Sequence, residues 1–292
     1  MKKIAIYGRQ FSDKYNDGVK LIFDLLKMRG IEVDVFEDFL GFVKNRVDID
    51  YGATYTRSSF DPSQYDMLVS IGGDGTMLDC TTLVKSSGLP LVGINTGRLG
   101  FLSSISLDTV PDALNQMLDG AYMVDRRTVL KVETDDNLFG DLNFALNEIT
   151  NHKKDSQSMI VIHAYVDGKF LNTYWADGLI IATPTGSTAY SLSCGGPIIL
   201  PSSNNFIITP VAPHNLSVRP VLISDQSVIT LRTEVRSENY LVSLDSRSAT
   251  VATDTVITVM KSDFTINLIR LKNHSFLKTL RNKLHWGYDR RN

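Results

Sequence analysis

Ile71-Gly72-Gly73-Asp74-Gly75-Thr76 carries the clearest structural signal in this sequence. An apolar run typical of a buried strand precedes it, and a segment with helical spacing of apolar residues follows it. We therefore expect a strand, a tight loop and a helix. Glycine lets backbone N–H groups come close to an oxygen-rich ligand, and the start of a helix adds unpaired N–H groups and the positive end of its dipole. The loop is suited to a polyphosphate.

Asp74 is the unusual member of this loop. A carboxylate beside phosphates is repelled unless it binds a divalent cation or accepts a proton from an attacking hydroxyl. Both roles belong to phosphoryl transfer. The alternative is a plain strand-to-helix turn in which Asp74 only caps the helix.

Two better known phosphate signatures are absent from the sequence. There is no Gly-x-x-x-x-Gly-Lys-Ser/Thr, and the first strand is not followed by Gly-x-Gly-x-x-Gly. The loop is therefore neither a P-loop nor an ordinary dinucleotide fingerprint.

The sequence on either side of the loop predicts a Rossmann-like α/β domain with a largely parallel sheet. Between residues 36 and 64 no clear period is present, which indicates loops with a short helix. The expected strands are Lys3–Tyr7, Ile31–Val35, Met67–Ile71 and Leu89–Ile94, and the expected helices run from Asp17 to about Gly30, over 77–84 and over 110–118.

After about residue 122 the pattern changes to short runs rich in Val, Ile, Thr and Tyr, which predict an all-β region, a β-sandwich. Leu277, Leu280 and Leu284 then resume helical spacing and predict a C-terminal helix that returns to the first domain. The expected domains are 1–122, 123–271 and the tail 272–292. The expected strands are Thr128–Glu133, Phe144–Thr150, Ile160–Val166, Leu179–Thr183, Val228–Arg232, Tyr240–Leu244, Val256–Met260 and Phe264–Leu271.

Composition excludes several classes of protein. The 292 residues are 43% hydrophobic and 21% charged, which excludes a disordered or fibrous chain. The net charge of −2 gives no electrostatic argument for nucleic acid or an anionic membrane as partner. No apolar run near the start resembles a signal peptide or a membrane helix, so we expect a cytoplasmic protein. Cys80 and Cys194 are interpreted as small, reduced core residues.

A second block, Asp177 to Ser193, concentrates hydroxyl groups and backbone donors around Gly186. Such groups match the needs of a nucleoside, because Tyr190 can stack on or pack beside an adenine while its neighbours bond the ring edge or the ribose. The alternative is a Ser/Thr-rich connection between strands.

Four further residues are candidates for ligand contacts. Asn147 and Glu148 close a β-type run, where an amide and a carboxylate can hold a ribose diol or an adenine edge, or simply end a strand at the surface. His214 suits a phosphate or ribose contact, or a structural role. Arg98 suits phosphate oxygens at the carboxyl end of a strand, or a surface ion pair. Lys153-Lys154, by contrast, is interpreted as a solvated face.

These motifs carry a resemblance to a known family. The loop at residues 72–76 resembles the signature shared by NAD kinases, diacylglycerol-type lipid kinases and, in a close variant, phosphofructokinases. The block at residues 177–193 closely resembles the glycine-rich motif of NAD kinases. Asn95 to Leu102, Asn147-Glu148 and Pro213 to Pro220 resemble further motifs of that family in the same order.

The resemblance implies transfer of the γ-phosphoryl group of ATP, or of inorganic polyphosphate, to the 2′-hydroxyl of the adenosine ribose of NAD. Asp74 would accept the proton of that hydroxyl, Gly72, Gly73 and Gly75 would let the backbone approach the phosphates, and Mg²⁺ would offset their charge. It also implies an α/β domain followed by a β-sandwich, and a homodimer or homotetramer with shared active sites.

The resemblance also assigns the dinucleotide contacts. Asp177 would contact the nicotinamide-bearing part, Ala212 would line the substrate site, and Trp175 would lie near the nicotinamide, where the choice between NAD and NADH stays open. Cys194 stands where the family commonly has Ala. The residues that would position the dinucleotide are Asn147, Glu148, Asp177, Thr188, Ala189, Tyr190, Ser191, Leu192 and Ser193.

Two alternatives to an NAD kinase remain open at this point. A lipid kinase of the same superfamily would share the first loop but would need an apolar entry for an acyl chain, and the second block argues against it. A non-catalytic dinucleotide sensor would use the same residues without turnover. The phosphoryl donor, feedback by NADP or NADPH, and the oligomer size are also left open.

Overall fold

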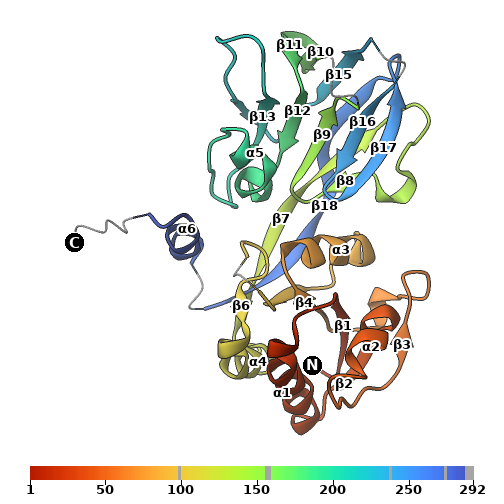
Figure 1. Cartoon of the computed structure of the whole chain (residues 1–292), viewed down its shortest axis with the longest axis vertical. Helices are drawn as coiled ribbons and strands as arrows, with labels where there is room; N and C mark the ends of the chain where they lie inside the picture. Colours follow the sequence, from red (N-terminus) through yellow and green to blue (C-terminus); the bar gives the residue numbers. More distant parts are fainter. Residues whose placement is uncertain (98–99, 155–158, 237–238, 273–274, 287–292) are drawn as a thin grey trace. The chain divides into compact units, whose positions relative to one another are not determined.

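The structure is a computed structural model that describes residues 1–97, 100–154, 159–236, 239–272 and 275–286 (Figure 1). The chain folds into two compact units, one formed by Met1–Arg126 with Ile266–Asn292 and the other by Arg127–Thr265. Two strands, β7 (Tyr122–Glu133) and β18 (Ile257–Leu271), each begin in one unit and end in the other. The assignment of separate domains to residues 1–122, 123–271 and 272–292 stays a prediction.

The first unit is built on a parallel sheet, as the alternation of apolar runs predicts. Its strand order is β18-β5-β4-β1-β2-β3, with β6 beside β5, and each of these neighbours is parallel. The strands other than β18 are β1 (Lys3–Gly8), β2 (Glu32–Phe36), β3 (Thr54–Tyr55), β4 (Met67–Gly72), β5 (Leu91–Asn95) and β6 (Ile105–Ser106).

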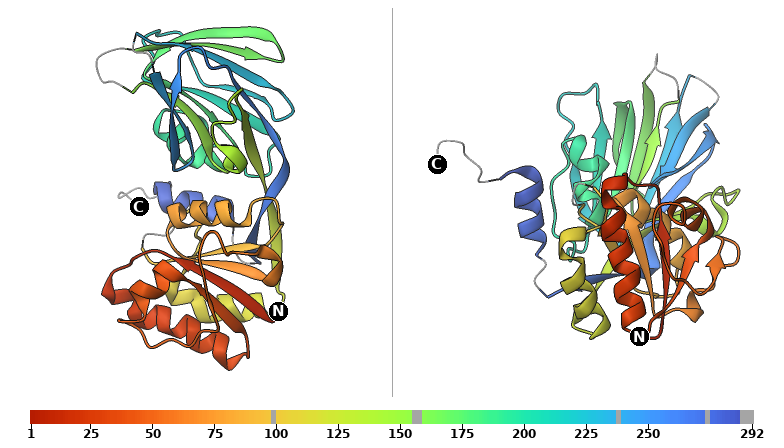
Figure 2. Two further views of the ribbon diagram at one scale, coloured as in Figure 1. Left: turned by 90° about the vertical axis from the view of Figure 1, so that its right-hand side faces the viewer. Right: turned by 60° about the horizontal axis from the view of Figure 1, so that its bottom comes forward.

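Helices pack on this sheet through apolar faces that recur at helical spacing. In α1, Val19, Ile22, Phe23 and Leu26 are buried, and Gly30, with φ +65, follows the helix at its end. Helices α1 and α4 lie side by side (Figure 2). The helices of this unit are α1 (Asn16–Met28), α2 (Glu37–Val43), α3 (Asp74–Val84), α4 (Val110–Leu118) and α6 (Phe276–Leu284).

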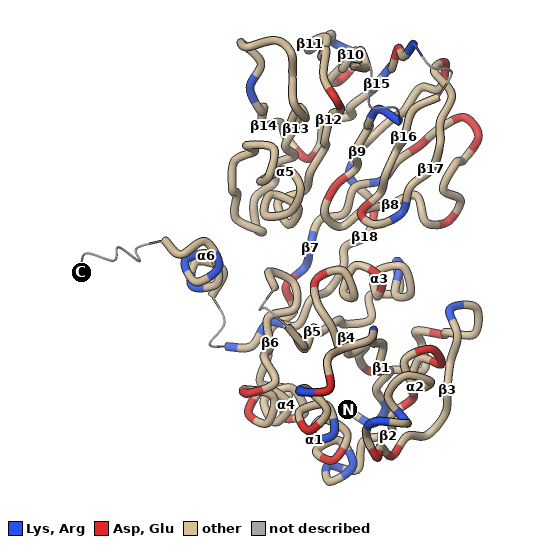
Figure 3. Tube along the Cα trace, viewed as in Figure 1, with Lys and Arg blue, Asp and Glu red and all other residues tan. Residues whose placement is uncertain are grey.

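The predicted C-terminal helix α6 belongs to the first unit, which confirms that part of the fold. The ring of Phe276 packs against the ring of Phe101 at 6.2 Å between centroids, and Lys283 Nζ lies 4.7 Å from the centroid of the same ring. Leu280 is buried. The helix is rich in Lys and Arg, while both acidic and basic residues are found in each of the two units (Figure 3).

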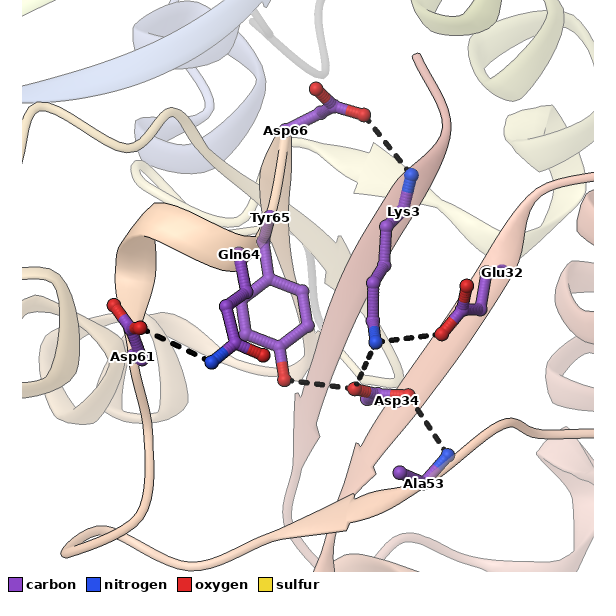
Figure 4. A network of polar contacts seen from close by, with 8 residues as sticks. All are labelled: Lys3, Glu32, Asp34, Ala53, Asp61, Gln64, Tyr65 and Asp66. Carbon is purple, nitrogen blue, oxygen red and sulfur yellow. Dashed lines mark hydrogen bonds and ion pairs between the residues drawn. The ribbon is translucent and has the colours of Figure 1, made fainter.

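A polar network closes the amino-terminal end of β1 and β2 (Figure 4). Lys3 Nζ lies 2.6 Å from Glu32 Oε1 and 2.9 Å from Asp34 Oδ2, and the Tyr65 hydroxyl donates to the same Asp34 oxygen at 3.0 Å. Although burial opposes ionisation, Lys3, the Ala53 N–H and Tyr65 together lower the pKa of Asp34. This network is a structural one, at the end of the strands opposite Gly72.

The second unit is a sandwich of two antiparallel layers, as the run of short strands predicts. One layer has the order β14-β13-β12-β9-β16-β17, and the other contains β11-β10-β15-β18 and the pair β7-β8. Buried side chains from both layers, such as Ile162, Leu179, Phe206 and Val242, form one core. The strands other than β7 and β18 are β8 (Phe144–Ala145), β9 (Glu148–His152), β10 (Ile160–Val166), β11 (Lys169–Ala176), β12 (Gly178–Ala182), β13 (Asn205–Val211), β14 (Val221–Ser224), β15 (Ile229–Glu234), β16 (Asn239–Leu244) and β17 (Arg247–Ala252).

Two of the expected stretches of strand have different bounds in the structure. The run Phe144–Thr150 is broken into β8 and β9, because the main chain at Leu146 and Asn147 turns its N–H groups toward the Asp245 carboxylate. The two expected strands Val256–Met260 and Phe264–Leu271 are one continuous strand, β18. Its polar middle is accommodated because Lys261 pairs with the buried carboxylate of Asp225.

Four strands of the second unit, β11, β13, β14 and β17, were not predicted. In β13 a proline, Pro210, interrupts the usual strand pattern. It is tolerated because β14 pairs with β13 only as far as Ile208 opposite Val221, so on that side Pro210 has no strand partner to which an N–H would donate.

No helix of the described residues is long and apolar enough to cross a membrane. Both cysteines have free thiols. Cys80 is fully buried, which raises its pKa to about 12. Cys194 is only partly buried, so the core position expected of both residues holds for Cys80 alone.

Candidate active site

The glycine-rich loop joins β4 to α3, which confirms the predicted strand, loop and helix. A Cβ atom on Gly72 would lie 2.2 Å from Thr76 Oγ1, so this glycine is required by packing. A Cβ atom on Gly73 or Gly75 would meet no described atom within 4 Å, and Gly73 has an ordinary φ of −107. Glycine inside a helix costs about 1 kcal/mol relative to Ala. Gly73 is the N-cap of α3, a position where glycine is accepted, whereas neither packing nor a positive φ explains Gly75, and both residues leave the main chain open at the start of α3.

The carboxylate of Asp74 is held by the loop that follows β5. Phe101 N–H donates to Oδ2 at 2.8 Å, while the N–H groups of Leu102 and Ser103 donate to Oδ1 at 3.1 and 2.8 Å. A Cβ atom on Gly100 would lie 1.8 Å from Asp74 Oδ1, so only glycine fits there. The N-cap of α3 is Gly73. The interpretation of Asp74 as a mere helix cap is therefore wrong.

Arg98 lies outside the residues that the structure describes. Its neighbour Asn95 ends β5, pairs in register with Gly72 and accepts the Gly97 N–H at 2.6 Å. The carboxyl end of β5 therefore lies beside the glycine-rich loop.

Two arginines that the sequence analysis missed lie at the same edge of the parallel sheet. Arg9 directly follows β1, and its guanidinium lies 2.5 Å from Asp79 on α3. Arg57 donates to the Tyr7 hydroxyl at 2.8 Å and to Thr82 Oγ1 at 2.9 Å. Open α/β sheets bind ligands at the carboxyl ends of their strands, so the position of Arg9 directly after the first strand was the signal that could have found it.

In the second unit, the block from Asp177 to Ser193 is brought against Asn147. Thr183 N–H donates to Asn147 O at 2.9 Å, and Thr183 Oγ1 donates to Leu146 O at 2.6 Å. A Cβ atom on Gly186 would lie 2.1 Å from Asn147 O, so the close approach of the two main chains requires glycine. The block ends in a 3₁₀ turn, Thr185–Thr188, and the short helix α5 (Tyr190–Ser193).

Within this block some side chains are buried and others are exposed to solvent. The Ser191 hydroxyl is fully buried and lies 2.9 Å from Thr209 Oγ1, and Thr188 Oγ1 donates to Thr185 O at 3.2 Å. Tyr190 is 40% exposed. Ser193 is also exposed, while Thr188, Ala189 and Leu192 are half-buried.

Four predicted residues gather where β11, β12 and β13 end or begin. His214 N–H donates to Trp175 O at 2.8 Å, and Asp177 N–H donates to Val211 O at 2.9 Å. Ala212 follows β13 with φ +44, a left-handed conformation that costs energy for a residue other than glycine. Such strain is typical of functional segments.

Asp177 has a partner that the sequence analysis misjudged. Lys153 Nζ lies 2.7 Å from Asp177 Oδ1, and the Lys153 side chain is only 19% exposed. The interpretation of Lys153 as part of a solvated face is therefore wrong. No local pattern marks the pairing of Lys153 with Asp177, because two adjacent lysines in a polar loop are common.

Glu148 is a titratable group of the second unit that lies largely buried. Burial raises the pKa of Glu148 to about 8, the charge of Asp245 adds to the effect, and the Tyr190 N–H opposes it. Its Oε2 atom is buried and, among the described residues, has no hydrogen-bond partner. A buried polar atom without a partner loses free energy, which a bound ligand would recover.

Within the described part of the chain, no group of three or more His, Cys, Asp or Glu side chains is placed to hold a metal ion. Mg²⁺ commonly takes only one or two carboxylates from a protein and several oxygens from substrate phosphates. A metal ion that arrives with a nucleotide therefore does not require such a group of protein ligands.

Comparison with known proteins agrees with the motifs and the geometry. Residues 25–122 match the model of the ATP-NAD kinase N-terminal domain, and residues 146–271 match that of the C-terminal domain. The chain is 45% identical over 290 residues to an NAD kinase of Cytophaga hutchinsonii, covering 99% of each chain. It is 44% identical over 291 residues to an NAD kinase of Bacteroides fragilis, also covering 99% of each.

Solved structures show the same fold. An NAD kinase from Archaeoglobus fulgidus, solved in complex with ATP, matches with a TM-score of 0.77 and 28% identity over 98% of this chain and 99% of that one. Yeast NADH kinase, solved with NADH, matches with a TM-score of 0.84 and 24% identity over 99% of this chain and 89% of that one. With both domain models matched and close relatives aligned from end to end, this chain belongs to the NAD kinase family.

Proposed function

We propose that this protein transfers the γ-phosphoryl group of ATP to the 2′-hydroxyl of the adenosine ribose of NAD, producing NADP. Membership of the NAD kinase family supports the reaction class. The observation that carries the assignment of residues is the open main chain of Gly73 and Gly75 beside the fixed carboxylate of Asp74. Inorganic polyphosphate is a second donor that the experiment below includes.

The phosphates of the donor would lie against the start of α3. The main chain there is unobstructed at Gly73 and Gly75, and the first N–H groups of a helix favour an anion. Arg9, 58% exposed at the carboxyl end of β1, and Arg98 would add positive charge. A Mg²⁺ ion bound by the nucleotide phosphates would offset the charge that builds up during transfer.

Asp74 would accept the proton of the attacking ribose hydroxyl. Its Oδ1 atom already receives two N–H groups, whereas Oδ2 receives one. A carboxylate oxygen has about two acceptor positions, so Oδ2 keeps one for the hydroxyl. The three N–H donors would hold the carboxylate in one orientation during the reaction.

The second unit would hold the dinucleotide. Asn147, Glu148 and the exposed ring of Tyr190 would contact the adenosine part, with Thr188, Ala189, Leu192 and Ser193 around the ring and the buried Ser191 supporting them. Asp177, oriented by Lys153, would contact the nicotinamide-bearing part, with Trp175, Ala212 and His214 beside it. A homodimer or homotetramer in the cytoplasm completes the proposal.

The decisive experiment incubates the purified protein with NAD or NADH, Mg²⁺ and either ATP or polyphosphate, and measures NADP(H) with an NADP-specific dehydrogenase. Product with NAD and ATP supports the proposal and identifies donor and acceptor. NAD binding without product from any combination would contradict it and favour a non-catalytic sensor.

A further inference from the structure

Asp245 lies in the turn between β16 and β17, and its side chain points into the second unit rather than to solvent. Its Oδ2 accepts the Leu146 N–H at 2.9 Å, and its Oδ1 accepts the N–H groups of Asn147 and Glu148 at 2.8 and 3.2 Å. In return, Asp245 N–H donates to Glu148 O at 3.0 Å. One aspartate therefore binds three consecutive residues, about a hundred positions away in the sequence.

The segment that Asp245 holds is an interruption in a strand. The chain leaves β8 at Ala145 and enters β9 at Glu148, and Leu146 and Asn147 between them belong to no strand. On the other side the segment is fixed by Thr183, whose hydroxyl donates to Leu146 O at 2.6 Å, and by the contact of Gly186 with Asn147 O. Its position thus depends on two supports, and Asp245 is the only carboxylate among the groups just named.

Asp245 also acts on Glu148 through its charge. The charge of Asp245 from the β16–β17 turn and the N–H of Tyr190 at the start of α5 act on the Glu148 carboxyl, and the charge of Glu148 in turn acts on Tyr190 and Cys194. Burial raises the pKa of Asp245, while its three N–H donors and the charge of Arg247 oppose that effect. N–H donors on both oxygens of Asp245 favour its charged form, whereas Glu148 has a buried oxygen that has no partner among the described residues, so a proton is bound more favourably by Glu148 than by Asp245.

We propose that Asp245 is a positioning residue for the dinucleotide, which holds the main chain of Leu146–Glu148 so that Asn147 and Glu148 present their side chains to the adenosine part, with Glu148 as a hydrogen-bond donor. This inference rests on the proposed function, and it adds to the reaction a residue that touches neither substrate. A ribose hydroxyl or an adenine ring nitrogen is the kind of acceptor that a protonated Glu148 would bind.

The test is the substitution Asp245→Asn. The amide keeps the shape of the carboxylate, but its NH₂ group must face one of the three N–H donors, so at least one hydrogen bond is lost. We expect the KM for NAD to rise roughly tenfold or more, with the KM for ATP nearly unchanged.

The matched control is Asp167→Asn. Asp167 lies in the turn between β10 and β11 with φ +50, and its carboxylate accepts the Val228 N–H at 2.9 Å and the Ser227 hydroxyl at 3.0 Å. It thus has the same structural role beside a segment that carries no proposed ligand residue. An equal rise in the KM for NAD in both variants would overturn the inference.

A pH profile distinguishes a specific effect on Glu148 from a general loss of structural order. Removing the charge of Asp245 lowers the pKa of Glu148, so the inflection near pH 8 in kcat/KM for NAD should move to lower pH in D245N. It should stay in place in D167N and be absent in E148Q. An inflection that D245N leaves unmoved contradicts the proposal.

A second substitution covers the case in which D245N does not fold. Thr183→Val removes the hydroxyl support on the other side of the segment, and we expect it to raise the KM for NAD without changing the KM for ATP. Calorimetric measurement of NAD binding in the same variants keeps this inference apart from the proposed function. Unchanged NAD affinity in every variant that folds overturns the proposed positioning of Leu146–Glu148. Weaker NAD affinity in the variants, together with a wild type that forms no NADP, overturns only the proposed turnover.

Discussion

The backbone N–H of Phe101 donates to Asp74 Oδ2 at 2.8 Å, while the ring of the same phenylalanine packs against Phe276 of the C-terminal helix. The proposed catalytic carboxylate is thus held by a loop whose side chain is itself anchored by α6. Gly100, next to Phe101, has no room for a side chain because Asp74 occupies that space. The orientation of Asp74 is a property of three separate segments of the first unit.

Replacing Asp74 by Asn should reduce turnover by roughly 10²-fold or more while NAD binding is largely retained, because the amide keeps the shape but accepts no proton. Steady-state kinetics and NAD calorimetry would measure the two effects. Asp24→Asn, which alters a surface ion pair with Lys20, serves as the control. Near-normal turnover of D74N would remove Asp74 from the role of base.

Replacing Gly75 by Ala should raise stability and impair donor binding at once. The added methyl group meets no described atom, and Ala is favoured over Gly in a helix by about 1 kcal/mol. If donor phosphates approach this main chain, the KM for ATP should rise about tenfold or more. Thermal unfolding and kinetics would be measured together.

Gly41→Ala in α2 is the control for that experiment. A Cβ atom on Gly41 also meets nothing within 4 Å among the described residues, so this variant should gain a similar stability. Its kinetics should not change. A G75A enzyme that is stabilised and binds ATP normally would contradict the placement of the phosphates.

Glu148 should make the protein less stable as the pH rises toward 8. Its pKa is raised in the folded protein to about 8, so between roughly pH 4.3 and 8 the folded state binds more protons than the unfolded state. The free energy of unfolding therefore falls with pH in that window, by at most about 1.4 kcal/mol per pH unit from this group. Denaturant unfolding between pH 5.5 and 8.5 would measure the slope, and E148Q should flatten it. An identical slope in the variant would show that another group is responsible.

Replacing Lys153 by Met should weaken NAD binding several-fold with little loss of stability, because it leaves Asp177 without the ammonium group 2.7 Å away that orients it. The matched control is Lys131→Met, which breaks an exposed pair with Glu133. Isothermal calorimetry with NAD would compare the two. Equal NAD affinity in K153M and the wild type would exclude an orienting role for Lys153.

Much of the fold could be predicted because its signals are local. Alternating apolar runs and helical spacing predicted the parallel sheet of the first unit and the strands of the sandwich. The strand predictions failed where the local sequence signal conflicts with contacts made to distant parts of the chain. Pro210 suggests no strand, yet β13 forms between two partners, and polar residues in the middle of β18 suggest a turn, yet Lys261 is paired with Asp225.

The candidate site likewise has a part that the sequence predicts and a part that it does not. The strand, loop and helix around Gly72 to Thr76 and the hydroxyl-rich turn around Gly186 could be predicted from the sequence, since glycines and periodicity act over a few residues. The groups that hold the functional residues become visible only in the folded chain: Phe101 holds Asp74, Lys153 holds Asp177 and Asp245 holds the main chain of Glu148. Each of these contacts joins residues that are far apart in the chain. Their geometry follows from how strands and loops pack, and no local pattern of residues encodes it.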